Sequence, residues 1–263
     1  MKFPSFASII FLGLLVYGGV ALGADKMAAP LAESGVLDVQ PYRLIIENGQ
    51  KTSVISIANK SDKPHRYILK LVNQVMDKNG LTRREDTFRY SLKGMVRFAP
   101  KSFLIQPEET QTVRVVVERP QGLADGDYHS HLIFSEPGVA DTIYSIAMPI
   151  IVQQGEVSGD MGISDAVINA LANGERQMTV RFTRTGNAEA AIKIKAEYTA
   201  PGKSPVEVMD PQWIRMYREV DTVTKSFMLG NIPPGAQGGK VVIRMIRDET
   251  NPQKFEEKEI PFD

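Results

Sequence analysis

Few residues of the chain have side chains and spacing suited to chemistry, and two histidines stand out among them. His129 and His131 lie two residues apart in "YHSHL", within a segment that alternates like a β-strand. Residues at this spacing share one face of a strand, where two imidazoles could bind copper or zinc. The third histidine, His65, lies in a predicted turn, and no third ligand is evident near the pair. We expect two exposed histidines on a strand, and a metal site stays open as an alternative.

The sequence offers no motif for catalysis. Ser130 lies between the two histidines, but the chain has no Gly-x-Ser-x-Gly elbow and no glycine-rich loop of the kind that holds phosphate groups. It has no cysteine, which excludes thiol catalysis and thiolate metal ligands. We therefore expect no catalytic residue, no bound metal and no other cofactor, and we do not expect an enzyme.

The first residues are expected to form a signal peptide, 1–23. Lys2 precedes an apolar run from Ile9 to Val16, and small residues follow it as far as Gly23. The run is too short to span a bilayer comfortably, and no second apolar segment is long enough to do so. The mature chain is thus expected to be exported, cleaved near Gly23 and without a membrane span.

Charge and cysteine content limit the partners and the means of stabilisation. Lys+Arg and Asp+Glu number 31 each, a balance that gives no reason to expect nucleic acid or an anionic membrane as a partner. Exported proteins can form disulfides, but this one has no cysteine, so packed cores alone must hold it. The mature length is sufficient for two such cores.

The elements that must position any site are short β-strands. Residues 36–155 contain several predicted strands separated by frequent turns, a pattern typical of an immunoglobulin-like sandwich. The glycine-rich segment 155–162 is expected to be the junction, and residues 156–263 repeat the pattern in half-exposed strands. We predict an all-β chain of two immunoglobulin-like β-sandwich domains, with Trp213 in the core of the second and no helix of normal length.

One predicted strand would be prone to aggregation in a protein without a partner. "YSIAMPIIVQQG" (144–155) is apolar at almost every position and carries Pro149 in its middle. Within sheets proline is tolerated at edges, and a long apolar edge strand is an aggregation site. The strand is therefore either an ordinary part of a sandwich core or an edge that pairs with another chain.

A longer segment resembles a known family. "RFAPKSFLIQPEETQTVRV", followed by "LADGDYHSHLIF", resembles the PapD-like periplasmic chaperones of pilus and fimbrial assembly in the chaperone–usher pathway. The likeness covers residues 36–155 well and residues 156–263 only as a generic second domain. Two features differ from the usual pattern, because Glu108 replaces a glycine and the segment 142–154 lacks the family's lysine. The chain is therefore expected to represent a non-classical branch.

The resemblance implies two domains in an L shape, a periplasmic location and two binding sites. In the cleft between the domains, a basic pair binds the C-terminal carboxylate of a pilus subunit, and "PYRLII" places Arg43 as one member of this pair. The last strand of the first domain fills a groove in a subunit that lacks a strand, which is donor-strand complementation. Its groove-filling face, at period two, comprises Tyr144, Ile146, Met148, Ile150 and Val152. Pro149 is expected to face away from the edge that pairs with the subunit.

The partners that this hypothesis implies are pilus subunits and the outer-membrane usher to which they are delivered. An idle copy could associate with a second copy through the same edge strand. Two alternatives stay open. One is a two-domain exported structural or adhesive surface protein, and the other is an exported metal-binding sandwich that uses His129 and His131.

Overall fold

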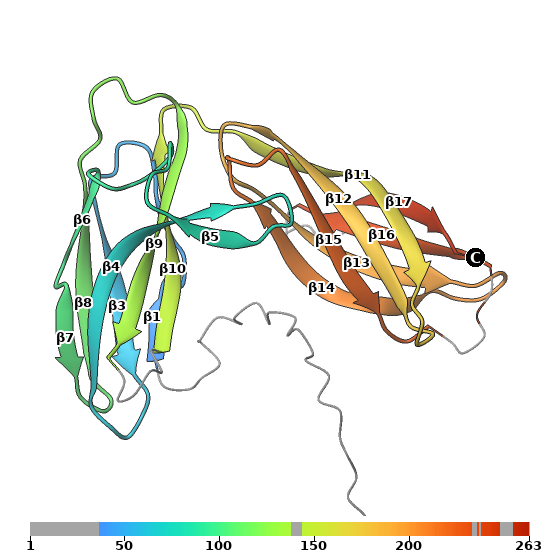
Figure 1. The fold of residues 1–263 in the computed structure, drawn as a ribbon, viewed down its shortest axis with the longest axis horizontal. Coiled ribbons are helices and arrows are strands. Elements are labelled where there is room, and N and C mark those ends of the chain that lie inside the picture. Colours follow the sequence, from blue (N-terminus) through green and yellow to red (C-terminus); the bar gives the residue numbers. More distant parts are fainter. Residues whose placement is uncertain (1–36, 138–143, 233–235, 237, 248–254, 263) are drawn as a thin grey trace, which may run out of the picture.

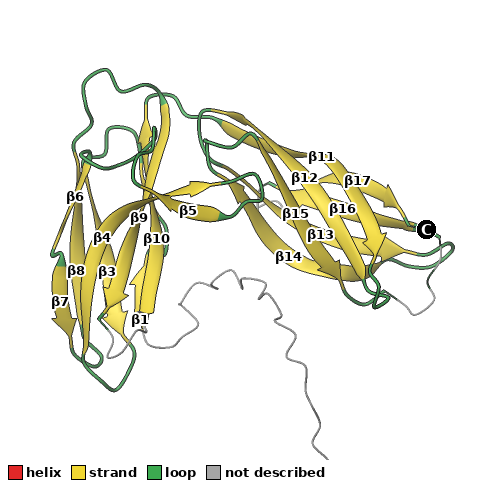
Figure 2. Ribbon diagram, in the orientation of Figure 1, coloured by secondary structure: helices red, strands yellow, loops and turns green. Residues whose placement is uncertain are grey.

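The computed structural model describes residues 37–137, 144–232, 236, 238–247 and 255–262. Every regular element in these ranges is a β-strand (Figure 2). Within the same ranges, no helix is long and apolar enough to cross a bilayer. The signal peptide expected at residues 1–23 lies outside the described residues.

The first domain is a sandwich of two sheets. Its strands are β1 (Leu37–Gln40), β2 (Leu44–Ile46), β3 (Thr52–Asn59), β4 (His65–Met76), β5 (Thr82–Glu85), β6 (Val96–Ala99), β7 (Ser102–Ile105), β8 (Thr110–Val117), β9 (Gly126–Glu136) and β10 (Tyr144–Gln154). One sheet has the order β1-β3-β8-β6, and the other has the order β2-β10-β9-β4-β5, with β7 also paired with β4. Alternate apolar residues of both sheets, such as Val115 and Leu132, are fully buried between them. The predicted sandwich is therefore present.

The segment 37–46 forms two strands that belong to different sheets. β1 pairs antiparallel with β3, whereas β2 pairs parallel with β10. Pro41 lies between them, where its missing N–H costs no ladder bond. The chain thus crosses from one sheet to the other just before Arg43. Arg43 therefore immediately precedes β2, the strand that pairs with β10.

The second domain is also a sandwich. Its strands are β11 (Gly159–Ala170), β12 (Arg176–Gly186), β13 (Ala190–Thr199), β14 (Val206–Met216), β15 (Thr222–Leu229), β16 (Lys240–Ile246) and β17 (Phe255–Pro261). The sheets have the orders β11-β12-β15 and β14-β13-β16-β17. β14 was not expected, because Asp210 and Pro211 interrupt its pattern; as an edge strand paired only with β13, it tolerates both. Trp213 lies on this edge and is 40% exposed, so its expected place in the core is wrong.

The two sandwiches meet at an angle near one end of each, and the β4–β5 hairpin reaches from the first toward the second (Figure 1). The sequence "DKNG" (77–80), which is typical of a tight hairpin turn, joins its two strands. At its tip the Lys78 carbonyl accepts a hydrogen bond from the Thr224 N–H at 2.9 Å. Gly80 has a φ of +74°, and a Cβ there would lie 2.7 Å from Cε of Lys225 and 2.9 Å from Cγ1 of Val223. The hairpin therefore packs closely on β15 and ties the domains together.

Candidate functional site

β10 has a partner strand along only part of one edge. It pairs with β9 along its whole length, from Tyr144 to Gln154. On the other side, β2 pairs only with the segment from Ile150 to Val152. In the described structure no strand pairs with the stretch from Tyr144 to Pro149 on that side. This stretch, which we call the open edge, exposes backbone groups to a partner.

The direction of the backbone groups explains why a proline is tolerated here. Hydrogen-bonded and non-hydrogen-bonded pairs alternate along an antiparallel ladder. His129 donates its N–H to the Tyr90 carbonyl, away from β10. By alternation, His131 also turns its backbone away from β10, so Pro149, its partner across the ladder, turns away from β9. Because Pro149 turns away from β9, its lack of an N–H costs no hydrogen bond to that strand. Its backbone faces the open edge instead, contrary to the expectation that Pro149 faces away from that edge.

By the same alternation, Ala147 and Ser145 direct their N–H and C=O groups toward the open edge. Pro149 can still offer its carbonyl there. A partner strand could therefore pair with the stretch before Pro149, and the proline closes that stretch on the side where β2 begins.

The five residues expected to fill a subunit groove divide into different environments. Met148, Ile150 and Val152 are 0–1% exposed and lie in the core of the first domain itself. Ile146 is partly buried and packs against the same core. The side chain of Tyr144 lies outside the described part of the structure. Ile150 and Val152 are also paired with strands on both sides, β2 and β9, so they belong to the sandwich. Of the five residues, only Tyr144, Ile146 and Met148 lie on the open edge.

Arg43 lies where the two domains meet, in the region of Arg43, Glu189 and Arg215 that we call the arginine cleft. Its guanidinium forms an ion pair with Glu189 and lies over the ring of Tyr217, 5.9 Å from its centroid. Both partners belong to the second domain. The side chain of Arg43 is only 12% exposed. In the free protein its charge is already paired with a carboxylate of the same chain.

A second arginine contacts the same carboxylate. Nη1 of Arg215 lies 3.4 Å from Oε1 of Glu189. Arg215 is 35% exposed and is part of β14, the strand that the sequence did not predict. Glu189 therefore has one arginine from each domain. Arg215 supplies a second cation in the cleft, where the sequence lacks a lysine on β10.

The two histidines are buried at the domain interface, so their expected exposure is wrong. His129 and His131 are 1% and 5% exposed. A hydrogen bond of 3.0 Å joins Nε2 of His129 to Oε2 of Glu219, and the ring of Tyr217 stacks on His129 with centroids 4.1 Å apart. The Tyr217 hydroxyl lies 3.3 Å from Nε2 of His131. Sequence spacing placed the two rings on one face, but it could not show that the second domain covers that face.

These contacts give the histidines a role in joining the domains. Glu219 also accepts a hydrogen bond of 2.9 Å from the Met76 N–H, beside the turn of the β4–β5 hairpin. Across the described residues, no group of three or more His, Cys, Asp or Glu side chains is arranged to hold a metal ion. Tyr217 and Glu219 thus connect the histidines with both the hairpin and the cleft.

Burial changes the ionisation of this cluster. Desolvation, with smaller contributions from His129 and Arg43, lowers the pKa of His131 to about 3. Desolvation likewise raises the pKa of Tyr217 to about 12, although Arg43 opposes the rise. His131 is therefore neutral and Tyr217 is protonated at neutral pH, which lets the interface form with few uncompensated charges.

Replacing His131 with glutamine is expected to make the fold less sensitive to acid. The unfolded histidine binds a proton near pH 6.5, and the folded one binds it only near pH 3. Between these values the unfolded state holds more protons, so stability falls as the pH falls, by about 2 kcal/mol at about pH 5. Urea unfolding at about pH 7.5 and about pH 5 should show a smaller loss in the variant by that amount. Burial raises the pKa of Asp127, which acts in the opposite direction in both proteins. Equal losses would contradict the assignment.

Comparisons with known proteins find similarity among solved structures. No family model matches the chain, and no curated protein does. The CsuC–CsuE chaperone–tip adhesion subunit pre-assembly complex, from archaic chaperone–usher Csu pili of Acinetobacter baumannii, is similar over 86% of this chain and 98% of that chain, with 12% identity and a TM-score of 0.49. The YadV chaperone is similar over 86% and 99%, with 14% identity and a TM-score of 0.48.

The Pseudomonas aeruginosa CupB2 chaperone is similar over 84% of this chain and 98% of that chain, with 11% identity and a TM-score of 0.42. The chain resembles these chaperones in its fold.

Proposed function

We propose that this protein is a periplasmic chaperone that captures pilus subunits on the open edge of β10. The observation that carries the proposal is that the open edge and the arginine cleft adjoin. β2 pairs with β10 in the register Leu44 to Ile150, so Arg43 lies one residue before that pairing, beside Pro149. A strand that runs along the open edge therefore reaches Arg43 where the edge ends.

This arrangement sets the direction of the captured strand. If the subunit's C-terminal carboxylate binds Arg43, the last strand of the subunit begins near Tyr144 and ends at the cleft. The captured strand is then parallel to β10. Main-chain pairing with Ser145 and Ala147 supplies affinity, and Tyr144 and Ile146 are the groove-filling residues that remain beside the edge, since Met148 is buried in the chain's own core.

In the free protein, Glu189 pairs with Arg43 in the place that the subunit's carboxylate would take. The subunit carboxylate would then exchange with Glu189 on Arg43, and Arg215 would hold whichever of the two is displaced toward the second domain. Such an exchange replaces one charge-assisted contact with another, so it needs no ATP. Delivery to an outer-membrane usher would release the subunit when another strand takes the place of β10.

Replacing Glu189 with glutamine is expected to strengthen subunit binding. The variant keeps the shape of the side chain but removes the competing charge, so Arg43 is available without an exchange. We expect an affinity increase of about fivefold, because the fraction of binding-competent molecules rises. Titration of a purified subunit by calorimetry measures this. A weaker complex would mean that Glu189 serves to hold the two domains together.

The proposal as a whole is tested by purifying the tagged mature protein from the periplasm of its own cells. We expect a small exported β-rich protein to accompany it at about one to one, as judged by mass spectrometry. A two-domain surface protein with a self-contained core would bring down no such subunit, and that result would overturn the proposal.

A further inference from the structure

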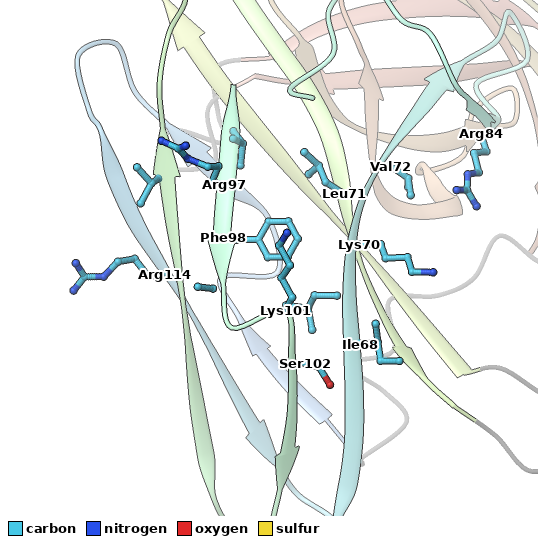
Figure 3. A pocket seen from close by; sticks show the side chains of 14 residues that line it. Ile68, Lys70, Leu71, Val72, Arg84, Arg97, Phe98, Lys101, Ser102 and Arg114 are labelled. Carbon is cyan, nitrogen blue, oxygen red and sulfur yellow. The ribbon is translucent and has the colours of Figure 1, made fainter. Parts of the chain in front are cut away.

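A groove lies along one edge of the first sandwich, between β4 and β6 (Figure 3). Its volume is about 1030 Å³, at the upper limit of the roughly 300–1,000 Å³ typical of small-molecule pockets. The apolar part of its lining includes Leu69, Leu71, Val96, Phe98 and Val116. These residues belong neither to the open edge of β10 nor to the arginine cleft, so the groove is a separate feature.

The charged part of the lining is entirely positive. It comprises Lys70, Arg84, Arg97, Lys101 and Arg114. Lys101 lies beside Phe98 between the strands, whereas Lys70 and Arg84 point outward on the side of β4, and Arg97 and Arg114 point outward on the opposite side (Figure 3). All five side chains are exposed, and no aspartate or glutamate lines the groove. Among the described residues, only Arg97 of the five forms an ion pair, with Glu118. Because the whole chain has equal numbers of basic and acidic residues, this is a local excess of positive charge that favours a negatively charged partner.

Two strand edges border the groove without a partner strand. β6 pairs with β8 and is the last strand of its sheet. On the side of β4 that faces away from β9, β7 pairs as far as Ile68, and β5 begins to pair at Asn73. In the described structure the stretch between them has no partner strand on that side, although the Leu69 N–H is bonded to the Lys101 carbonyl. Unpaired edges of this kind bind extended peptides by β-strand addition.

We propose that this groove binds an extended acidic segment of another protein. Main-chain groups of β4 or β6 pair with the segment, and the apolar lining receives alternate side chains. The carboxylates of the segment pair with Lys101 between the strands and with the cations that flank the groove on its two sides. A groove with strand edges suits a polypeptide better than a membrane, whose surface offers no main-chain groups. β9 separates β4 from β10, so the groove and the open edge can be occupied together.

The test measures peptide binding to the mature full-length chain by fluorescence anisotropy. The probe is a fluorescein-labelled octapeptide of alternating glutamate and valine, and the matched control is the lysine–valine octapeptide. We expect the glutamate peptide to bind at least about tenfold more tightly at about 50 mM salt and to weaken at about 300 mM, since exposed charges are screened. Equal binding of the two peptides would overturn the proposal.

Variants locate the site. The double change Lys70→Glu and Arg114→Glu should weaken binding at least about tenfold, whereas Lys60→Glu with Lys203→Glu, two exposed lysines outside the groove, should change it less than about twofold. Ala147→Pro, on the open edge of β10, should have no effect. Unchanged binding in the first variant, or loss in either of the others, would overturn the proposal. So would binding of phosphatidylglycerol vesicles with no binding of the peptide, because the partner would then be a membrane.

Discussion

Ala147→Pro should strongly weaken subunit capture while the protein stays folded. Ala147 is exposed, and its backbone groups face the open edge, so the substitution removes no hydrogen bond to β9. It removes a donor that the captured strand needs and places a ring at the pairing edge. Loss of main-chain bonds with steric overlap should cost about 2 kcal/mol or more, which weakens binding at least about 30-fold. Calorimetry with the purified subunit measures the change.

The matched control for this variant is Ala147→Ser, which keeps the N–H and is expected to bind like the natural protein. Thermal unfolding of both variants verifies that the first domain is intact. The same pair tests self-association, because an idle dimer formed through β10 would dissociate with proline and persist with serine. A folded proline variant that still binds the subunit at full strength would show that the open edge is not used.

Arg43→Ala should weaken the subunit complex at least about 30-fold, because a carboxylate brought into the cleft loses its main cation. Arg43 also contacts Glu189 and Tyr217, so a simple loss of affinity could come from a changed domain interface. The design therefore pairs the variant with a subunit whose C terminus is extended by Gly-Ser-Gly. This extension moves the carboxylate out of the cleft.

The extended subunit should already bind weakly and should lose little more with Arg43→Ala, because the two changes remove the same interaction. Arg43→Lys, which keeps the charge but loses the planar guanidinium, should fall between the natural protein and alanine. An equal loss for both forms of the subunit would mean that Arg43 acts on the domain interface and not on the carboxylate.

Strand pattern predicted much of the fold, because alternation of apolar residues reports directly which face of a strand is buried. Valines 113, 115 and 117 alternate in the sequence, and all three lie in the core. The pattern failed at β14, where Asp210 and Pro211 break the alternation on an edge strand. Burial of Trp213 was also overestimated, since its side chain is exposed on β14 beside Arg215, with the guanidinium carbon 5.0 Å from the ring centroid.

The candidate site was harder to predict, because its groups come from both domains. Arg43 was found through the resemblance, but no spacing in the sequence connects it with Glu189 or Arg215. The pattern of "YSIAMPIIVQQG" indicated an apolar edge, yet it could not show that β2 covers the last part of that edge. Only the register between β2 and β10 shows that the open part ends beside Arg43.

The central claim, that the open edge of β10 pairs with a subunit strand, is tested most directly by hydrogen exchange at the backbone amides of Ser145 and Ala147. In the free protein both amides face an edge without a partner strand and should exchange rapidly. In the complex purified from the periplasm, both should slow by about 100-fold or more, while Pro149 has no amide to report. Exchange of these two amides at the same rate in the free protein and in the complex would contradict the account.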